Sequence, residues 1–331
     1  MSDITTIDLQ LRPKNLAEYI GQENAVNALQ LFLSGIKKRG YVAEHLLFHG
    51  PPGLGKTTLA HIVASELGGE LKITSGPAIE KAGDLAAILT NLNDNDVLFI
   101  DEIHRLSKSI EEILYPVLEE YVLDIIIGKG PAARSVRLPI PKVTIVGATT
   151  RIALLSATLR DRFGLILRLN PYELDSLVKI VKRSANMVNL PISDEAALAI
   201  AKRSRHTPRI ANRILKRVRD LFDVHSHKII DEKMVNELFE LLSIDEKGLN
   251  ELDNLYIQTL IEKFEGGPVG LTTISTAMNE DKQTLEEYIE PYLIQVGLLR
   301  KTPKGRVASP TAFTHFNIAD KKIVSEKEKL V

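Results

Sequence analysis

The stretch GPPGLGKT, residues 50–57, decides the fold of this chain. It follows the apolar run HLLF (45–48) and leads into KTTLAHIVASEL (56–67), whose composition is helical. The stretch matches the pattern G-x-x-x-x-G-K-[ST], in which glycines let backbone amides turn around anionic oxygens and the next helix adds partial positive charge. A glycine-rich turn with an exposed lysine is the alternative. The strand before it and the helix after it favour a phosphate site.

Apolar runs and helical stretches alternate around this loop, from residue 44 to about 170. The runs are short and rich in β-branched residues or leucine: LKIT (71–74), VLFI (97–100), VTIVGA (143–148) and LILRL (165–169). Helical stretches such as SIEEILYPVLEEYV (109–122) lie between them. This alternation predicts an α/β fold with a parallel sheet covered by helices.

The pattern changes twice after residue 172. Four helical stretches come first, and then helices followed by the basic hairpin LLRKTPKGRVAS (298–309), an order typical of a winged helix. We therefore expect a large ATPase domain over 1–172 with a protruding hairpin at 124–141, an all-α lid over 173–243 and a winged-helix domain over 244–318. The charged tail, 319–331, is predicted to be disordered.

The composition excludes several classes of protein. The 331 residues carry a net charge of −1 and include no cysteine, which rules out disulfides and thiolate metal sites and fits a cytoplasmic protein. The N-terminus MSDITTIDLQ is no signal peptide, and no run approaches a membrane-spanning helix. Any surface that binds nucleic acid must be a local basic patch.

Polar residues follow two further apolar runs, and the carboxyl ends of parallel strands meet at one edge of a sheet. VLFI delivers Asp101, which would bind Mg²⁺ through its water shell, and Glu102, which would polarise an attacking water as a general base. VTIVGA delivers Thr149 and Thr150, whose hydroxyls would sense the γ-phosphate. A solvated helix start is the alternative for the two carboxylates, and capping of a helix or turn is the alternative for the two threonines. His104 is expected to be a structural residue at a helix start.

Two more segments complete the expected site. In the phosphate loop, Lys56 would reach the β- and γ-phosphates and Thr57 would hold Mg²⁺. In HTPRIANR (206–213), Pro208 precedes Arg209 at a helix start. On a lid over the nucleotide Arg209 would contact the γ-phosphate, and an ordinary surface arginine is the alternative. These residues predict a site for ATP or ADP with Mg²⁺.

Together the motifs resemble the AAA+ ATPases and, more closely, the RuvB family of motors for Holliday junction branch migration. The resemblance covers roughly residues 10–318. Its motifs are LRPKNLAEYIGQ, HGPPGLGKTTLA, TSGPAIEKAGDLAAILTNL, DVLFIDEIHRLS, DIIIGKGPAARS, GATTR, LRDRFG, TPRIANR, KFEGGPVGL and EPYLIQVGLL. The phosphate loop alone indicates only an NTPase, whereas DIIIGKGPAARS and TPRIANR in one chain are far more specific.

The resemblance implies roles for single residues. Those around the adenine and ribose are Leu11, Arg12, Glu120, Tyr121, Val122 and Tyr172. Those that hold the phosphates and Mg²⁺ are Gly53, Gly55, Lys56, Thr57 and Thr58. Asp101 and Glu102 form the metal-and-base pair, Thr150 is the first sensor and Arg209 the second.

Arg162, in LRDRFG (159–164), resembles the arginine finger of the family. The phosphate loop already supplies Lys56, so a second basic residue at this sheet edge needs another anion. The resemblance implies that Arg162 reaches the γ-phosphate bound by a neighbouring subunit, a contact that can be worth about 10³–10⁵ in rate. The alternative is an ion pair with Asp161 or Asp101 of its own chain.

The segment DIIIGKGPAARSVRLPIP (124–141) interrupts the alternation and predicts a hairpin with exposed aliphatic side chains, a common sign of a partner surface. The alternative is a hairpin folded onto its own core. In RuvB-like proteins this hairpin docks RuvA, the junction-binding partner, and the resemblance places the contact on Ile125 and Ile127.

Charge indicates how DNA is held. The expected recognition helix, 284–299, carries Glu286, Glu287 and Glu290, whereas the hairpin 298–309 carries basic residues and no acid. Electrostatics therefore favour a wing that touches the DNA backbone over a helix that reads bases, unless the wing is only a solvated basic turn. The contacts of the family fall on Lys282, Lys301 and Arg306. At the first two we expect arginine in much of the family, and lysine loses the bidentate geometry.

The sequence thus predicts an ATP-driven motor, in a hexameric ring, that pulls duplex DNA without sequence preference through a RuvA-bound junction in recombination and repair. The resolvase RuvC is a further possible partner, and no membrane contact is expected. A clamp loader would end in a helical collar, a replication initiator would carry a basic recognition helix, and a protein-remodelling ATPase would carry an aromatic pore loop.

Overall fold

The computed structural model describes residues 10–40, 42–127, 134–225 and 228–318. Packing divides the chain into two compact units. The first unit comprises Met1–Pro191 and His206–Leu215, and the second comprises Ile192–Arg205 and Lys216–Val331. Among the described residues, no helix is long and apolar enough to cross a membrane.

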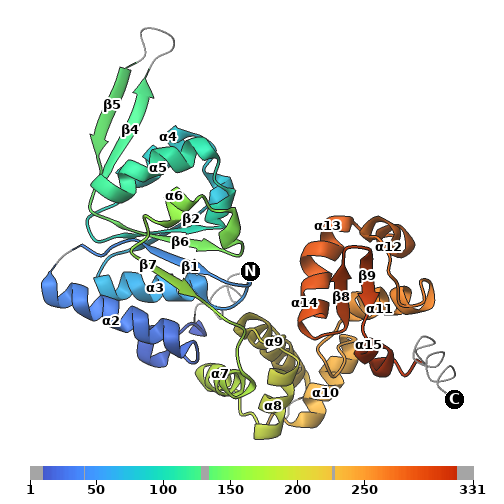
Figure 1. Ribbon diagram of the computed structural model, residues 1–331. Coiled ribbons are helices and arrows are strands. Elements are labelled where there is room, and N and C mark those ends of the chain that lie inside the picture. Colours follow the sequence, from blue (N-terminus) through green and yellow to red (C-terminus); the bar gives the residue numbers. More distant parts are fainter. Residues whose placement is uncertain (1–9, 41, 128–133, 226–227, 319–331) are drawn as a thin grey trace. The chain divides into compact units, whose positions relative to one another are not determined.

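A parallel sheet of five strands, in the order β2-β3-β6-β1-β7, forms the centre of the first unit (Figure 1). Its strands are β1 (Leu46–His49), β2 (Leu71–Ser75), β3 (Val97–Asp101), β6 (Thr144–Thr149) and β7 (Leu165–Arg168). Each predicted apolar run forms one of these strands, and every neighbouring pair is parallel. The prediction of an α/β fold is confirmed.

Helices cover both faces of this sheet (Figure 1). They are α2 (Glu23–Arg39), α3 (Lys56–Leu67), α4 (Ala82–Thr90), α5 (Lys108–Glu120) and the short α6 (Ala157–Arg160), whereas α7 (Leu174–Met187) follows β7 outside these layers. Single turns of 3₁₀ helix lie at Leu16–Glu18, Gly76–Ala78, Ile103–Arg105 and Ile152–Leu154. Helix α3 ends at Gly68, whose left-handed backbone (φ 75°) lets its N–H bond back to the last turn. Alternate strand residues face α4 and α5, where Leu98, Ile100 and Ile145 join one buried core.

A two-stranded antiparallel hairpin extends from this unit (Figure 1). It consists of β4 (Val122–Ile127) and β5 (Arg134–Pro139), and its turn lies outside the described residues. The predicted hairpin is confirmed. Ile125 and Leu138 at its base are only half-exposed, because they pack against the core of the first unit. At its base, the hairpin therefore folds onto the core of its own chain, which was the alternative to a fully exposed partner surface.

The second unit begins with helices of the expected lid. The four helices predicted after residue 172 are present: α7, α8 (Asp194–Lys202), α9 (Pro208–His225) and α10 (Glu232–Leu241). Ser193 caps α8 by accepting the N–H of Ala196. By packing, α7 and the start of α9 belong to the first unit, while α8, α10 and the rest of α9 belong to the second.

The remainder of the second unit, which we call the head, is a bundle of helices with a small antiparallel ribbon. Its elements are α11 (Glu251–Glu262), α12 (Leu271–Met278), α13 (Lys282–Thr284), the π-helical segment η6 (Leu285–Ile289), α14 (Glu290–Gln295), β8 (Leu299–Thr302), β9 (Gly305–Ala308) and α15 (Pro310–His315). The hairpin predicted from LLRKTPKGRVAS is confirmed, with Thr302 opposite Gly305 at its turn. The helix predicted over 284–299 was too long, since it ends at Gln295.

Candidate functional site

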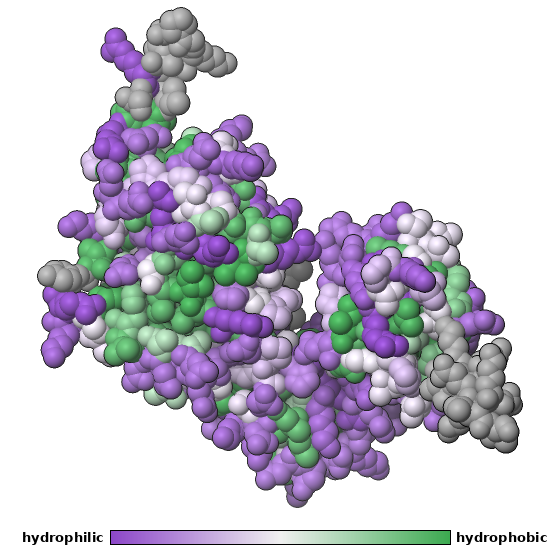
Figure 2. All heavy atoms as spheres, in the orientation of Figure 1, coloured by the Kyte–Doolittle hydropathy of each residue, from purple (hydrophilic) through white to green (hydrophobic). Residues whose placement is uncertain are grey.

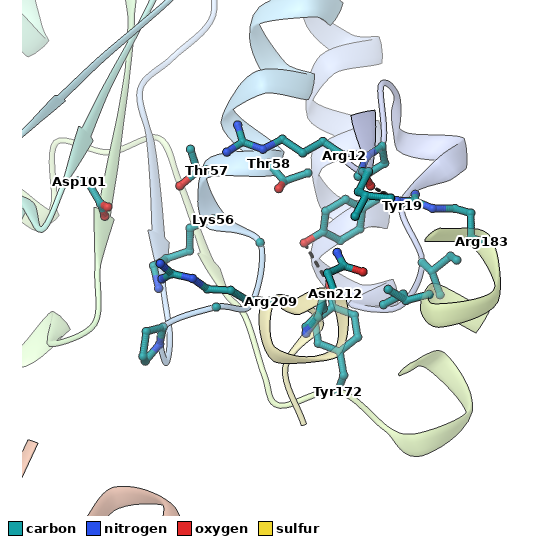
Figure 3. A pocket seen from close by; sticks show the side chains of 18 of the residues that line it. Arg12, Tyr19, Lys56, Thr57, Thr58, Asp101, Tyr172, Arg183, Arg209 and Asn212 are labelled. Atoms are coloured by element: carbon teal, nitrogen blue, oxygen red, sulfur yellow. Dashed lines mark hydrogen bonds between the residues drawn. The ribbon is translucent and has the colours of Figure 1, made fainter. Parts of the chain in front are cut away.

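A cavity of about 530 Å³ opens at the carboxyl edge of the parallel sheet. Its walls belong entirely to the first unit. The lining residues are Leu11, Arg12, Pro13, Tyr19, Ile20, Pro52, Gly53, Gly55, Lys56, Thr57, Thr58, Asp101, Glu102, Thr150, Tyr172, Ile180, Arg183, Pro208, Arg209 and Asn212. Figure 3 shows two ends: Lys56, Thr57, Asp101 and Arg209 gather at one, and aromatic and basic residues from other segments gather at the other.

The loop between β1 and α3 forms the first end. Gly53 and Gly55 both have left-handed backbone, with φ of 80° and 102°. A side chain at Gly55 would collide with the hydroxyl of Tyr19, so this position requires glycine on two grounds. The loop leads into the N-terminus of α3 at Lys56, where unpaired backbone N–H groups favour an anion.

Lys56 is a buried cation held by backbone groups. Its side chain is 8% exposed, and Nζ donates to the carbonyl oxygens of Gly50 at 2.8 Å and Pro51 at 2.9 Å. Burial lowers the pKa of Lys56, whereas the nearby charges of Asp101 and Glu102 raise it. Neither carbonyl neutralises the ammonium, so its charge remains available to a phosphate in the cavity.

The carboxylates at the end of β3 face the same cavity. The N–H of Glu102 donates to Oδ1 of Asp101 at 3.0 Å. Oε2 of Glu102 accepts from the Thr150 hydroxyl at 3.2 Å and lies 3.1 Å from Nδ1 of His104, which in turn lies 2.9 Å from the Thr149 hydroxyl. Burial is the main cause that lowers the pKa of His104, and the Glu102 charge opposes it. Both threonines and His104 thus fix the direction of Glu102.

The donor set suits a magnesium ion. A hydroxyl from Thr57 and a carboxylate from Asp101 line one cavity beside the phosphate loop. Mg²⁺ prefers oxygen ligands and is commonly held by one or two carboxylates together with substrate phosphates.

The second end of the cavity contains three polar residues that the sequence analysis did not single out, Tyr19, Arg183 and Asn212. The Tyr19 hydroxyl donates to the carbonyl of Leu54 in the phosphate loop at 3.2 Å and accepts from the Tyr172 hydroxyl at 3.2 Å. Burial raises the pKa of Tyr19. Arg183 donates to the carbonyls of Glu18 at 2.8 Å and Leu11 at 2.6 Å, and Asn212 completes the wall.

No local pattern marks these three residues, and the carbonyls that Tyr19 and Arg183 bind lie far away in the chain. The only signal was that Tyr19 lies inside the stretch LRPKNLAEYIGQ and Asn212 inside TPRIANR, and neither stretch says which member faces the nucleotide.

Most of the predicted nucleotide residues come together in this cavity. They are Leu11, Arg12, Gly53, Gly55, Lys56, Thr57, Thr58, Asp101, Glu102, Thr150, Tyr172 and Arg209. Arg209 approaches from the start of α9, and its side chain packs against Gly53.

The segment Glu120 to Val122 does not line the cavity. It ends α5 and begins β4 near the opposite edge of the sheet, where the Tyr121 ring lies 5.8 Å from that of His45, just before β1. Glu120 forms an ion pair with Arg137 of the hairpin at 3.2 Å. The expectation that this segment surrounds the adenine is therefore not met by the pocket of the same chain.

Arg162 also lies outside the cavity. Its guanidinium stacks 4.4 Å from the centre of the Tyr115 ring, forms an ion pair with Glu119 at 3.1 Å and donates through Nη1 to the Thr158 carbonyl at 2.7 Å. Its ion pair is thus with α5, and not with Asp161 or Asp101 as the alternative had it.

The expected DNA contacts lie in the head. Lys282 is exposed at the start of α13. Lys301 and Arg306 face each other across β8 and β9. Both pair with glutamates: Lys301 with Glu286 at 2.7 Å, and Arg306 with Glu290 at 2.8 Å. Of the expected partner contacts, Ile125 is half-buried at the hairpin base, and the side chain of Ile127 lies outside the described part of the structure.

Three family models together match nearly the whole chain. The model for the Holliday junction DNA helicase RuvB P-loop domain matches residues 11–169, that for the RuvB AAA lid domain matches 172–245, and that for the RuvB C-terminal winged helix domain matches 246–317.

Individual proteins agree with these models. The chain is 54% identical over 310 residues to the Holliday junction branch migration complex subunit RuvB of Clostridium kluyveri, covering 94% of this chain and 89% of that protein. Its structure is similar to that of the Thermotoga maritima RuvB Holliday junction branch migration motor, with a TM-score of 0.82 at 48% identity, covering 94% of this chain and 99% of the other. An A156S mutant of the Thermotoga protein gives a TM-score of 0.84, with 93% of this chain and 99% of the other covered.

Proposed function

Because the chain belongs to the RuvB family, we propose that it is an ATP-driven motor that moves Holliday junctions along DNA together with RuvA, in the cytoplasm, during recombination and repair. One observation carries the proposal. The phosphate loop, the carboxylate pair and Arg209 converge on one cavity, while Arg162, the remaining basic residue expected at the reaction centre, lies elsewhere. A neighbouring subunit would complete a pocket of this kind by supplying its own Arg162.

The bound triphosphate would lie along the first end of the cavity. Lys56 and the amides at the start of α3 would hold its phosphates, and Thr57 with Asp101 would hold Mg²⁺, which neutralises phosphate charge when bound. Tyr19 fixes the loop from behind through the Leu54 carbonyl. The base and ribose would occupy the second end, beside Leu11, Arg12 and Tyr172.

Glu102 would act as the general base. Thr150 and His104 both contact its Oε2, so Oε1 is the oxygen that would accept the proton of the attacking water. As that proton moves, the bond from the water oxygen to the γ-phosphorus forms, and the bond from the γ-phosphorus to the leaving oxygen of ADP breaks. Thr150 would report the loss of the γ-phosphate as the first sensor, and Arg209 would do so from α9 as the second.

A ring of identical subunits, which we take to be a hexamer, would bring Arg162 to the γ-phosphate of the next subunit. The edge strand β7 supports a contact between copies, because Ile166 is 38% exposed and hydrophobic surface gathers in this part of the first unit (Figure 2). Glu120, Tyr121 and Val122 directly follow Glu119, the ion-pair partner of Arg162. Their contact with a nucleotide would therefore also be across the interface.

The arginine finger has its own test. Arg162→Ala should bind ATP and lose about 10³-fold or more in turnover. Mixed with the unchanged protein, it should poison rings, so that activity falls faster than the fraction of unchanged subunits. A linear fall would show that Arg162 acts only within its own chain.

The hairpin β4–β5 would dock RuvA. Ile125→Asp with Ile127→Asp should abolish stimulation by RuvA and leave the intrinsic ATPase rate unchanged. Since Ile125 packs partly against the core, loss of both activities would show that this hairpin is structural. The resolvase RuvC would act on the same junction after the motor.

The head would hold duplex DNA by its backbone. Lys282, Lys301 and Arg306 supply charge without base readout, which is what a motor that moves along any sequence requires.

Branch migration of a synthetic four-way junction tests the whole proposal. With ATP and RuvA the chain should convert the junction to duplex products regardless of sequence, and the Lys56→Met variant serves as the inactive control. ATP turnover that responds to one particular DNA sequence, or that accompanies no junction movement, would instead favour an initiator or a clamp loader.

A further inference from the structure

Two glutamates of the head reach across to the basic ribbon. Glu286 lies in η6 and Glu290 begins α14, so they are one helical turn apart on the same side of the helix. Lys301 and Arg306 are cross-strand partners in β8 and β9. The four side chains form one cluster, in which both expected DNA-binding cations already have carboxylate partners.

The pair of Arg306 with Glu290 is largely buried, since the Arg306 side chain is only 14% exposed. Glu290 is 1% exposed, and its Oε1 accepts from Nε of Arg306 at 2.8 Å while its Oε2 accepts from Nη2 at 3.2 Å. The Tyr256 hydroxyl, also fully buried, donates to the same Oε1 at 2.9 Å. The backbone of Arg306 exchanges two hydrogen bonds with Val269, which holds β9 in place.

The pair of Lys301 with Glu286 is exposed. The two side chains are 44% and 49% exposed, and Nζ lies 2.7 Å from Oε1. Lys301 also lies 3.3 Å from Oε2 of Glu290, and Arg306 lies 3.4 Å from Oε1 of Glu286. The hydrogen bond to Glu286 is the largest cause that raises the pKa of Lys301.

Burial decides which pair can open. An exposed ion pair is weak and screened by salt, whereas removing one partner of a buried pair leaves a desolvated charge without compensation. A phosphate that approaches the ribbon can therefore replace Glu286 at Lys301. It cannot replace Glu290 at Arg306 without depriving a buried carboxylate of its two-point contact with this arginine, which Tyr256 and the longer contact to Lys301 supplement.

We propose that Glu286 is a stand-in for a DNA phosphate, which holds Lys301 in the free head and yields it to the backbone of bound duplex, while Arg306 stays with Glu290 as the positioning residue of the wing. The inference rests on the proposed binding of DNA by this wing. It assigns the exchangeable contact to Lys301 and makes Glu286 an internal competitor that eases release of each phosphate as the motor advances.

The test is a set of duplex affinities measured by fluorescence anisotropy, with the full chain, a non-hydrolysable ATP analogue and labelled duplex of arbitrary sequence, between about 50 and 200 mM salt. Glu286→Gln should bind about two- to fivefold more tightly, since the competitor is lost. Glu287→Gln is the matched control, because it removes the same charge one residue away, and it should change affinity less. Combined with Lys301→Ala, the gain from Glu286→Gln should disappear.

Two results separate the proposals. If Lys301→Ala weakens binding and lowers the magnitude of the salt slope by about 1, the wing binds backbone phosphate. A Glu286→Gln variant that then binds no more tightly than the control, or that keeps its gain without Lys301, overturns the stand-in role. An unchanged affinity and slope for Lys301→Ala would overturn the DNA-binding wing itself, and with it the inference.

Discussion

The two units of the molecule stabilise their buried charged or titratable side chains in different ways. In the first unit, backbone groups bind three of them, His45, Lys56 and Asp96, whereas Glu111 accepts from the Ser156 hydroxyl. His45 lies between the N–H of Ile145 and the carbonyl of Leu118, Lys56 donates to two carbonyls of its own loop, and Asp96 accepts two backbone N–H groups.

In the second unit, the buried carboxylates form ion pairs with arginines. Asp253 is fully buried and pairs with Arg205, which also donates to the Gly248 carbonyl at 2.9 Å. Glu290 pairs with Arg306 in the same manner. Each of these arginines donates through both Nε and Nη2 within the chain.

The difference shows how a cation is made available to a ligand. A carbonyl orients an ammonium without neutralising it, and Asp101 and Glu102 act on Lys56 only as nearby charges, so Lys56 can bind phosphate without first losing a carboxylate partner. A carboxylate compensates the charge, so a phosphate must first displace it, and only an exposed pair such as Lys301 with Glu286 permits this at low cost.

The largest effect should come from removing the cation that backbone carbonyls hold. Lys56→Met keeps the apolar stem in its buried position and removes the charge, so ATP turnover should fall by about 10²–10³-fold or more. Steady-state turnover with and without RuvA measures this loss. Lys37→Met on α2 is a control, because that lysine is exposed and pairs with Glu66. Equal losses of ATP turnover in the two variants would show that a lysine held by carbonyls is no more important than one in an exposed ion pair.

Next in size is the loss of a buried compensating carboxylate. Glu290→Ala leaves Arg306 with only its longer contact to Glu286 and the Tyr256 hydroxyl without its acceptor, and should destabilise the head by about 3 kcal/mol. Hydrogen exchange of peptides around Tyr256 and Arg306 measures this locally. Glu286→Ala, at the exposed position, should shift the same peptides by less than about 0.5 kcal/mol. Similar shifts in both variants would mean that burial does not distinguish the two pairs.

The sequence predicted the phosphate end of the cavity in the first unit well, for a physical reason. The phosphate loop is local: glycines, lysine and threonine lie within eight residues, and the strand and helix around them follow from periodicity in the same stretch. The carboxylates at the end of β3 could be placed opposite the loop because parallel strands share an edge. What the periodicity could not show was the second end of the cavity, where Tyr19 and Arg183 bind carbonyls far along the chain.

The side-chain ion pairs of the head were harder to foresee. Counting charges by segment separated an acidic helix from a basic ribbon, and the acids were expected to repel DNA. The structure instead pairs Glu286 with Lys301, 15 residues apart, and Glu290 with Arg306, 16 residues apart. Such pairs depend on how a helix and a ribbon pack, and this helix includes a π-helical segment that changes which residues share a face.

A smaller effect is expected from pH on the core of the first unit. The Ile145 N–H donates to Nδ1 of His45 at 2.9 Å, so Nε2 carries the proton and bonds to Leu118 at 3.0 Å. Burial lowers the pKa of His45 to about 4, from 6.5. Since the unfolded chain binds the proton first, stability is complete above pH 6.5 and is lost as the pH falls toward 4. The loss should reach about 2 kcal/mol at pH 5.

Hydrogen exchange of β1 and β6 at pH 5 and 7.5 measures this loss. His45→Asn is the control, because its amide oxygen can still accept from Ile145 but does not titrate in this range. The pH dependence of the variant should be smaller by about 2 kcal/mol. The same dependence in both proteins would show that His45 is not the group that titrates.

The smallest effect concerns the geometry of an arginine pair. Arg205→Lys keeps the charge beside Asp253 but loses the second donor to Gly248 and the stacking on the Tyr292 ring, at 4.5 Å. The lost hydrogen bond predicts a destabilisation of about 1 kcal/mol, seen as faster hydrogen exchange in peptides over residues 245–253. Arg217→Lys, in an exposed pair with Asp220, should change nothing measurable. If Arg205→Lys is equally silent, charge alone stabilises the buried carboxylates of the second unit, and the fixed direction of the guanidinium contributes nothing there.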